Sequence, residues 1–221
     1  MDKIAICITT RNRKEAFDKC IEQMSLFMPD NARLFIVDDA SDIPAPDADF
    51  RFSFRSGIPV AKNKCIELAM CWGANHIFLF DDDTYPISIN WHIPYIDSPY
   101  KHLCYTFLES YKSVNGHKYH LLGNGCVMYI HRDVVEAIGG FDLTFGLGKY
   151  EHTQFSHRAS AAGFCPVPYV DVIGSEKLFY SMDEHGEVER TMTSKEMGEQ
   201  LKSGRQHFRK TLNDLSFYHY N

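Results

Sequence analysis

Short apolar segments alternate with segments of helical periodicity along the first 85 residues, and this alternation constrains the fold more than any other feature. The apolar segments are rich in β-branched and aromatic residues, as buried strands are. They cover residues 3–10, 32–41 and 76–83, and the helix-periodic segments cover residues 13–27 and 60–73. Continuously apolar strands separated by helices are typical of a parallel sheet that helices cover on both faces. We therefore expect an α/β fold.

Each of the three predicted strands ends in polar residues. The polar clusters run from Thr9 to Arg13, from residue 38 to residue 41, and from Asp81 to Asp83. Any one of them is explained equally well by a turn. However, the carboxyl ends of parallel strands lie at the same edge of a sheet, where ligands bind in open α/β folds. Three polar clusters at one edge therefore predict a ligand-binding crevice.

The remainder of the chain has a weaker pattern. Residues 84–120 are rich in Pro, Tyr, His and Asn without clear periodicity, so we expect an excursion with weak strands. Residues 121–142 predict a glycine turn, a strand and a short helix. A further helix is expected to begin near Glu151 and to stop at Gly163, and another is expected around residues 194–213. The length of 221 residues suits a single domain with a substantial core.

Composition excludes several classes of protein. The longest apolar run falls short of the roughly 18 residues of a membrane span, and the charged first 20 residues do not resemble a signal peptide. We therefore expect a soluble protein of the cytoplasm. The net charge of −6 argues against a protein that coats nucleic acid, and the basic residues between 195 and 210 are expected to form a solvated helix face. The seven cysteines form no CxxC pair, so we expect buried thiols rather than a zinc site or disulfides.

Three consecutive aspartates, Asp81 to Asp83, follow an apolar strand although their charges repel one another. A shared divalent cation would offset this repulsion, and carboxylate oxygens suit hard ions such as Mg²⁺ or Mn²⁺. A cation held by one or two carboxylates keeps positions open for phosphate oxygens. The sequence has neither GxGxxG nor GxxxxGK[ST], the phosphate-binding motifs of Rossmann and P-loop proteins. The aspartates thus predict a nucleotide diphosphate bound through a metal ion.

Six sequence blocks follow one another along the chain: IAICITTRNR, LFIVDDASD, GIPVAKNKCIELA, IFLFDDDTYP, GNGCVMYIHRDVVEAIGGFD and YEHTQFSHRASAAGF. Their order resembles that of family 2 type glycosyltransferases with the GT-A fold. Each block alone is weak, but six in order are a strong signal for the superfamily. The resemblance implies a Rossmann-like, mostly parallel central sheet flanked by helices on both faces. It also implies a single domain with a nucleotide-sugar-binding half at residues 1–85, an acceptor-binding and catalytic half at 86–175, and a partly helical tail at 176–221.

The resemblance also implies a donor site, residue by residue. Thr9 and Arg13 match residues that line the nucleotide pocket. Asp39 matches an acceptor of hydrogen bonds from the base, commonly uracil, whose imide N–H needs such an acceptor. Lys62 stands where the family usually has arginine, and with Asn63 it is implied to lie beside the ribose and the phosphates.

The three aspartates match the DxD motif of the family. Asp83 is implied to bind the metal ion, and Asp81 to contact the ribose or to reach the metal through water. Asp82 is the interposed residue of this donor site. Many relatives add a metal-binding histidine after the last core strand, and His185 is the nearest histidine to that place in this sequence. A single histidine in a polar tail is more often solvated than ligating.

An inverting transfer needs a base that removes the proton of the incoming hydroxyl. The family usually carries it in a Glu-Asp pair at the start of the late helix, and this chain has Glu151 and His152 there. If the position of the aspartate matters, His152 is the base, because an imidazole titrates near neutral pH. Otherwise Glu151 is the base. A third interpretation has Glu151 favouring the first helical turn and His152 solvated.

The acceptor side is implied by two glycine-containing blocks. Asn124 and Gly125 lie in a small-residue turn that the family places beside the acceptor, and Asp142 ends a GGFD block that is implied to face it. The glycines of the second block have an equally good structural explanation, because glycine ends helices.

The sequence thus predicts a metal-dependent enzyme that moves a sugar from a nucleotide diphosphate donor, with a UDP-sugar expected first, to an acceptor hydroxyl with inversion. The acceptor is expected to be a saccharide or glycan, and a hydroxymethylated DNA base, as some phage enzymes use, is less favoured. A nucleotidyltransferase is the alternative enzyme, although the segment after the first strand lacks the glycine of its phosphate loop. An inactive nucleotide-sugar-binding module is the alternative from another class.

Overall fold

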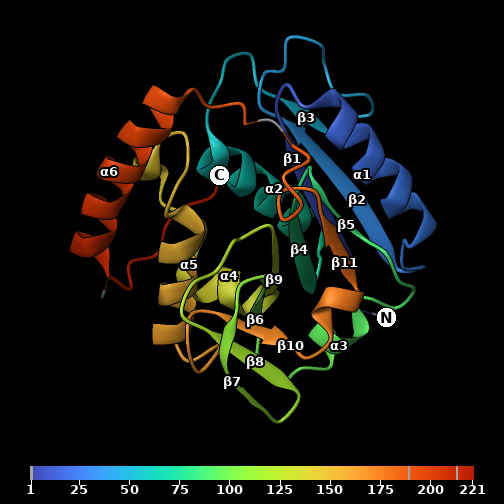
Figure 1. Cartoon of the computed structure of the whole chain (residues 1–221), viewed down its shortest axis with the longest axis vertical. Coiled ribbons are helices and arrows are strands. Elements are labelled where there is room, and N and C mark those ends of the chain that lie inside the picture. Colours follow the sequence, from blue (N-terminus) through green and yellow to red (C-terminus); the bar gives the residue numbers. More distant parts are fainter. Residues whose placement is uncertain (1, 189, 213) are drawn as a thin grey trace.

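The computed structural model describes residues 2–188, 190–212 and 214–221. Six strands form the central sheet: β1 (Ile4–Thr10), β2 (Ala32–Asp38), β3 (Phe50–Arg51), β4 (His76–Asp81), β6 (His102–Tyr105) and β9 (Val127–His131). Their order across the sheet is β3-β2-β1-β4-β9-β6 (Figure 1). The first four strands in this order are parallel, whereas β9 is antiparallel to both β4 and β6. The expected mostly parallel α/β sheet is therefore confirmed.

The centre of this sheet is buried on both faces. In β1, which pairs with β2 and β4, every residue from Ile4 to Ile8 is at most 1% exposed. Successive side chains of a strand point to opposite faces, so burial of all five residues requires cover on each face. This explains why the strand is apolar at every position instead of alternating.

Two helices follow the first strands, close to the predicted ranges. They are α1 (Lys14–Leu26) and α2 (Ile58–Trp72), and α2 packs against β1, β2 and β4. Pro59 lies in the first turn of α2, and Gly73 ends it in a left-handed conformation, where a Cβ would be strained. The amide of Gly57 donates to Asp39 directly after β2, so the N-terminus of α2 lies at the carboxyl edge of the sheet.

Residues 84–120 are more regular than predicted. They contain β5 (Thr84–Pro86), α3 (Ile93–Ile96), β6, and a hairpin of β7 (Ser110–Val114) and β8 (His117–His120). The later strand β10 (Val170–Val172) extends the hairpin into a three-stranded antiparallel sheet, and β11 (Phe179–Ser181) pairs with β5. These pairings join segments far apart in the chain, so local periodicity does not reveal them.

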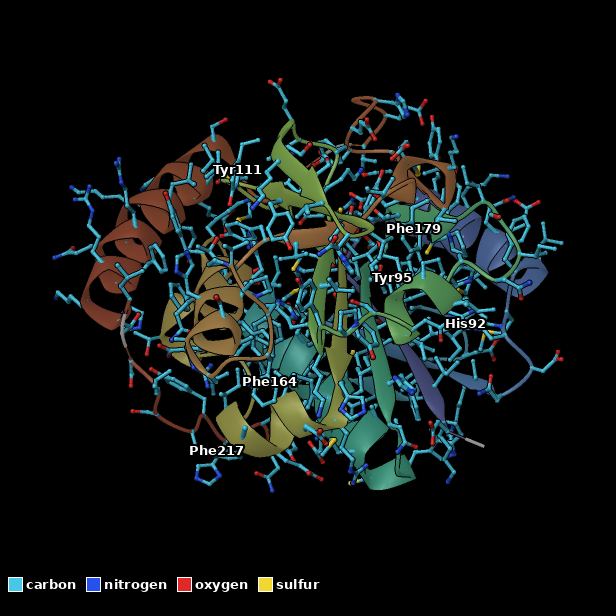
Figure 2. The ribbon with its side chains drawn as sticks, turned by 90° about the horizontal axis from the view of Figure 1, so that it is seen from below. His92, Tyr95, Tyr111, Phe164, Phe179 and Phe217 are labelled. Carbon is cyan, nitrogen blue, oxygen red and sulfur yellow. The ribbon has the colours of Figure 1, made fainter. Side chains whose placement is uncertain are left out.

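Aromatic side chains fill the space between the central sheet and these smaller sheets. Tyr95 and Phe179 are both buried, and their ring centroids lie 5.7 Å apart (Figure 2). Trp91 is also fully buried, with its ring centroid 5.6 Å from that of Phe179. By contrast, Tyr111 and Phe217 lie at the edge of the molecule and are exposed. Most aromatic residues in the irregular middle of the chain thus form core.

The second half contributes α4 (Arg132–Ile138), the 3₁₀ turns η1 (Leu143–Phe145) and η2 (Ser175–Lys177), α5 (Glu151–Ala161) and α6 (Ser194–Thr211). α6 lies outside α5, on the side away from the central sheet (Figure 1). The predicted helix extended to residue 213, which lies outside the described residues. Its basic residues are exposed, as expected: Lys195, Lys202, Arg205, Arg209 and Lys210.

The cysteines behave largely as predicted. All seven are free thiols, and all except Cys71 are buried. They therefore pack as small apolar side chains. None of the described helices combines the length and the apolar character needed to cross a membrane.

Candidate functional site

A cavity of about 180 Å³ opens at the carboxyl edge of the central sheet. One wall comes from the ends of β1, β2 and β4 and from α2, and it carries these predicted residues: Thr9, Arg13, Asp39, Lys62, Asp81, Asp82 and Asp83. The other wall comes from the second half of the chain, and it carries Asn124, Glu151 and His152. The structure therefore brings three polar strand ends together and sets the start of α5 opposite them.

Asp82 is tightly held within the aspartate cluster. Its carboxylate accepts a hydrogen bond of 2.6 Å from the hydroxyl of Thr10 and lies 3.1 Å from a guanidinium nitrogen of Arg13. Burial raises the pKa of Asp82 to about 7, although Arg13 and Thr10 act in the opposite direction. Asp82 therefore ties the end of β4 to the end of β1.

Arg13 connects two of the aspartates. One nitrogen of its guanidinium pairs with Asp82, and the other donates to Asp83. Asp83 is 6% exposed and also accepts from the hydroxyl of Thr84 at 3.3 Å. The sequence placed Arg13 beside the nucleotide, and the structure shows that its guanidinium also fixes the carboxylates in position.

Lys62 forms a buried link between the two walls of the cavity. Its Nζ lies 3.3 Å from Oδ1 of Asp81, 3.4 Å from the carbonyl oxygen of Gly125 and 4.0 Å from Oε1 of Glu151. Burial alone would lower the pKa of Lys62, but Asp81 and Glu151 outweigh it and raise the pKa. Lys62 is therefore a charged ammonium at 2% exposure, and its removal would leave two carboxylates facing each other.

Asp39 holds the loop that leads into α2. Its two carboxylate oxygens accept hydrogen bonds from the backbone amides of Ser56, at 2.6 Å, and Gly57, at 2.9 Å. A carboxylate oxygen has more than one lone pair, so each oxygen can still accept a further hydrogen bond from a ligand. The role predicted for Asp39 is thus compatible with its structural contacts.

Glu151 opens α5 and is almost completely buried, at 3% exposure. Its Oε1 lies 3.3 Å from Nδ1 of His152, and its Oε2 has no hydrogen-bond partner within the described part of the chain. Burial would raise the pKa of Glu151, but His152 and Lys62 outweigh it and lower the pKa to about 2. The cavity wall thus contains an ionised carboxylate, and one of its oxygens has no hydrogen-bond partner among the described residues.

His152 lies beside Glu151 with both ring nitrogens near acceptors. Nδ1 faces Glu151, and Nε2 lies 3.2 Å from the carbonyl oxygen of Gly123. Gly125 packs against the same ring: a Cβ at Gly125 would lie 2.6 Å from the imidazole, and its φ of +72° also favours glycine. The turn around Gly125 therefore seats His152 in the cavity wall.

Four predicted site residues do not line the cavity, and one of them is Gly125, which packs against His152 as described above. The side chain of Asn63 accepts a hydrogen bond of 2.7 Å from the amide of Phe141 and donates one of 2.9 Å to its carbonyl oxygen. Asp142 accepts from Nε2 of His207 at 2.6 Å and caps η1. His185 is exposed and stacks on a tyrosine ring. Asn63 and Asp142 thus fasten neighbouring segments, and His185 does not lie with the aspartates.

Several residues of the cavity were missed from the sequence. They come from the loops before α2 and α5, from the first turns of α2 and α6, and from the segment before α6: Arg55, Ile58, Leu147, Lys149, Asp183, Arg190, Thr191, Met192 and Met197. Asp183, Arg190 and Thr191 belong to a polar tail without periodicity, so only tertiary packing places them here. Its basic residues offered a weak signal, since a nucleotide site needs positive charge.

Carboxylates concentrate in one part of the cavity, at the end of β4 and the start of α5. Asp81, Asp82, Asp83 and Glu151 lie there around Arg13 and Lys62, whereas the lining as a whole has six Asp or Glu and six Lys or Arg residues. This local concentration of carboxylate oxygens suits a divalent cation. Among the described residues no cluster of three or more His, Cys, Asp or Glu side chains is placed to hold a metal ion. Asp81 and Asp83 would therefore supply one or two ligands, and phosphate and water oxygens the others.

Comparison with known proteins identifies the fold. No protein-family model matches the chain, and no curated protein matches it in sequence. The mannosyltransferase PcManGT from Pyrobaculum calidifontis, in complex with GDP-Man and Mn²⁺, matches with a TM-score of 0.62 at 14% identity, over 96% of this chain and 64% of that one. S. aureus TarS 1–349 in complex with UDP-GlcNAc matches with a TM-score of 0.61 at 11% identity, over 97% of this chain and 68% of that one.

The extent of these matches limits what they establish. The chain spans 64% of the length of the mannosyltransferase and 68% of TarS 1–349, and both identities are below 15%. A likeness at this level concerns the backbone, because sites with different chemistry are built on the same fold. The chain therefore has the GT-A-like fold of glycosyltransferases, as the order of its sequence blocks predicted.

Proposed function

We propose that this protein is a metal-dependent glycosyltransferase that moves a sugar from a nucleoside diphosphate, first of all a UDP-sugar, to a hydroxyl of a saccharide or glycan, with inversion. One observation carries the proposal: a single cavity of a GT-A-like fold holds both the aspartates of β4 and a buried, ionised glutamate at the start of α5. The two solved structures described above, with GDP-Man and with UDP-GlcNAc, support a nucleotide-sugar as donor.

The first wall of the cavity provides the donor site in this proposal. Asp39 receives the imide N–H of the base on an oxygen that already holds the loop before α2, so the acceptor is fixed before the ligand arrives. Thr9 lies in the same wall. Asp81 and Asp83 would hold Mg²⁺ or Mn²⁺ against the diphosphate, and that cation would stabilise the negative charge of the leaving group. Arg13 and Lys62 keep the two carboxylates in place.

The second wall provides the base. Glu151 lines the cavity, and its Oε2 has no partner within the described residues, so we assign this oxygen as the acceptor of the hydroxyl proton. The acceptor hydroxyl donates its proton to this oxygen as it attacks the anomeric carbon from the side opposite the diphosphate, which inverts the configuration. His152, hydrogen-bonded to Oε1, orients the carboxylate. This assigns the base to Glu151 and a positioning role to His152.

The experiment that tests the donor site is a thermal-shift screen with UDP, GDP and their sugar conjugates, each with and without Mn²⁺. A ligand of the native state raises the melting temperature. We expect one nucleotide class to produce a shift that needs Mn²⁺, and we expect Asp83→Ala to abolish it. Asp18→Ala is the matched control, because Asp18 is an exposed residue of α1 that does not line the cavity.

The outcome also decides between the enzyme and the alternatives. An enzyme should slowly hydrolyse its donor without acceptor, whereas an inactive binding module should bind without turnover. Absence of any Mn²⁺-dependent shift would contradict the donor site. Transfer to hydroxymethylated DNA but to no saccharide would keep the transferase and replace the proposed acceptor.

A further inference from the structure

Lys149 differs from every other cationic side chain in the cavity wall. Six lysine and arginine residues line the cavity. Five of them contact a carboxylate or a backbone carbonyl: Arg11, Arg13, Arg55, Lys62 and Arg190. Lys149 makes no such contact with any residue that the structure describes. Within the described chain it is therefore the one cation of this wall that contacts neither a carboxylate nor a backbone carbonyl.

The backbone at Lys149 is held in an unfavourable conformation. Lys149 has a φ of +74° and Tyr150 a φ of +71°, so two consecutive non-glycine residues are left-handed directly before Glu151. Each such residue is less stable than its right-handed form, because its Cβ crowds the backbone. Conformations of this kind persist where surrounding structure enforces them, and they are common at functional sites.

α6 enforces this conformation. Gly204 is the buried residue of α6, and a Cβ at this position would lie 2.6 Å from the carbonyl oxygen of Lys149. The ring of Tyr150 stacks on that of Phe208, with centroids 5.8 Å apart. The side chain of Gln200 accepts a hydrogen bond of 3.2 Å from the amide of Leu147. Residues on three successive turns of α6 therefore contact the segment that contains Lys149.

We propose that Lys149 binds the phosphate oxygens of the donor, and that α6 holds it in the cavity for this purpose. The inference rests on the proposed function. A nucleoside diphosphate brings several negative charges into a cavity whose acidic residues already hold Arg13, Lys62 and Arg190. Among the described residues of the wall, Arg11 also has no carboxylate partner, but its guanidinium is held by the carbonyl oxygens of Asp39 and Ala40. A divalent cation and Lys149 are therefore best placed to receive that charge. An ammonium beside the leaving diphosphate also stabilises the charge that grows on it when the anomeric bond breaks.

The test uses two variants of Lys149: one removes the side-chain charge, and the other keeps it. Asparagine tolerates a positive φ, so Lys149→Asn removes the charge without new strain, and Lys149→Arg keeps the charge. Calorimetry with inorganic pyrophosphate in the absence of metal, and with UDP and uridine in the presence of Mn²⁺, measures the anion contact directly. We expect Lys149→Asn to weaken pyrophosphate and UDP about 10- to 100-fold, Lys149→Arg to weaken them far less, and uridine to be unaffected.

A second pair of variants tests the role of α6. Gly204→Ala should displace the carbonyl of Lys149 and weaken pyrophosphate binding in the same direction. Gly198→Ala is the matched control on the same helix, because a Cβ there meets no atom within 4 Å. Amide hydrogen exchange of residues 147–153 should increase in Gly204→Ala and stay unchanged in Gly198→Ala, and this readout does not depend on activity.

The outcomes separate this inference from the proposed function. Wild-type affinity of Lys149→Asn for pyrophosphate would overturn the inference. A Lys149→Asn protein that binds UDP normally but has a raised KM for an anionic acceptor would also overturn it, since Lys149 would then serve the acceptor. Lys149-dependent pyrophosphate binding without any nucleotide-sugar binding would uphold the anion site while contradicting the glycosyltransferase.

Discussion

The two walls of the cavity differ in how their charged groups are held. On the wall formed by β1, β4 and α2, Asp81, Asp82 and Asp83 each contact a fixed cation, either Arg13 or Lys62. On the wall that precedes α5, Oε2 of Glu151 has no hydrogen-bond partner among the described residues. The charged groups of the first wall are thus paired before a ligand binds, whereas the second wall has a carboxylate oxygen without a hydrogen-bond partner.

The difference follows from the origin of each wall. The first is built from neighbouring strand ends, whose register places Thr9 of β1 opposite Asp81 of β4. The second consists of a loop with left-handed residues, and α6 holds it from outside through Gly204 and Phe208. Substitutions in the first wall should therefore lower the stability of the protein, and substitutions in the second should mainly lower turnover.

The largest expected effect is on turnover, from Glu151→Gln in the second wall. Glutamine keeps the shape of the side chain but cannot accept the proton, so kcat should fall about 100- to 10,000-fold. The dissociation constant of the donor should change little, because the base does not hold the donor. Steady-state kinetics and calorimetry measure the two quantities separately.

His152→Gln is the comparison variant for this experiment. Nδ1 of His152 contacts Oε1 of Glu151, so its loss should disturb orientation and lower kcat less than Glu151→Gln does. If His152→Gln were the more damaging of the two, His152 would be the base and the comparison of the walls would need revision.

The next largest effect is on stability, from Lys62→Met in the first wall. Methionine preserves the volume of the stem but leaves Asp81 and Glu151 without their shared cation. Breaking a buried ion pair on one side costs about 3–5 kcal/mol of unfolding free energy. Urea denaturation of both proteins measures this difference directly.

Lys64→Met is the matched control for Lys62, because both residues lie on α2. Lys64 pairs with Glu67 three residues later, near the surface. Such a helical pair contributes about 0.2–0.5 kcal/mol. Similar losses of stability in Lys62→Met and Lys64→Met would show that the first wall does not depend on a buried cation.

The first wall was also the more predictable of the two from sequence. Its strands are apolar at every position and its carboxylates follow them directly, so strand-end geometry places Asp81 to Asp83 at the crevice. What the sequence missed there is pairing: Arg13 bridges Asp82 and Asp83, and that contact depends on how β1 and β4 align. The resemblance to a family, rather than any local pattern, pointed to Glu151.

The second wall was less predictable because its geometry is tertiary. Nothing local to Lys149 indicates a left-handed backbone, and nothing local to Gly204 indicates that its missing Cβ makes room for a carbonyl. Asn63 illustrates the opposite error. It is adjacent to Lys62 in α2, but its side chain faces Phe141. Its amide therefore forms hydrogen bonds with the backbone of Phe141.

Acid should loosen the second wall before the first. His102 of β6 is completely buried. Its Nε2 shares a hydrogen bond of 2.9 Å with the hydroxyl of Ser156 in α5, and its Nδ1 lies 3.0 Å from the carbonyl oxygen of Tyr129. Burial lowers the pKa of His102 to about 4. The unfolded chain binds this proton near pH 6.5, so the contribution of His102 to stability should fall by about 3 kcal/mol as pH decreases from about 6.5 to about 4.

The measurement is urea denaturation across this pH range for the wild type and His102→Gln. The variant should start less stable but lose less stability on acidification. His185→Gln is the control, because His185 is exposed. Hydrogen exchange should show α5 losing protection before β1, and a simultaneous loss in both elements would argue against separate responses of the two walls.

The smallest expected effect concerns the start of α6. Thr193 and Glu196 form a capping box, in which the Thr193 hydroxyl accepts from the amide of Glu196 and the Glu196 carboxylate accepts from the amide of Thr193. Thr193→Ala should cost about 1 kcal/mol of unfolding free energy, whereas Ser194→Ala, one residue later, removes no cap.

Because Glu196 also pairs with Arg55 at 2.6 Å, fraying of this turn would release Arg55 into the cavity. Donor affinity should then change in Thr193→Ala but not in Ser194→Ala, and equal donor affinities would show that α6 supports Lys149 without influencing the loop before α2.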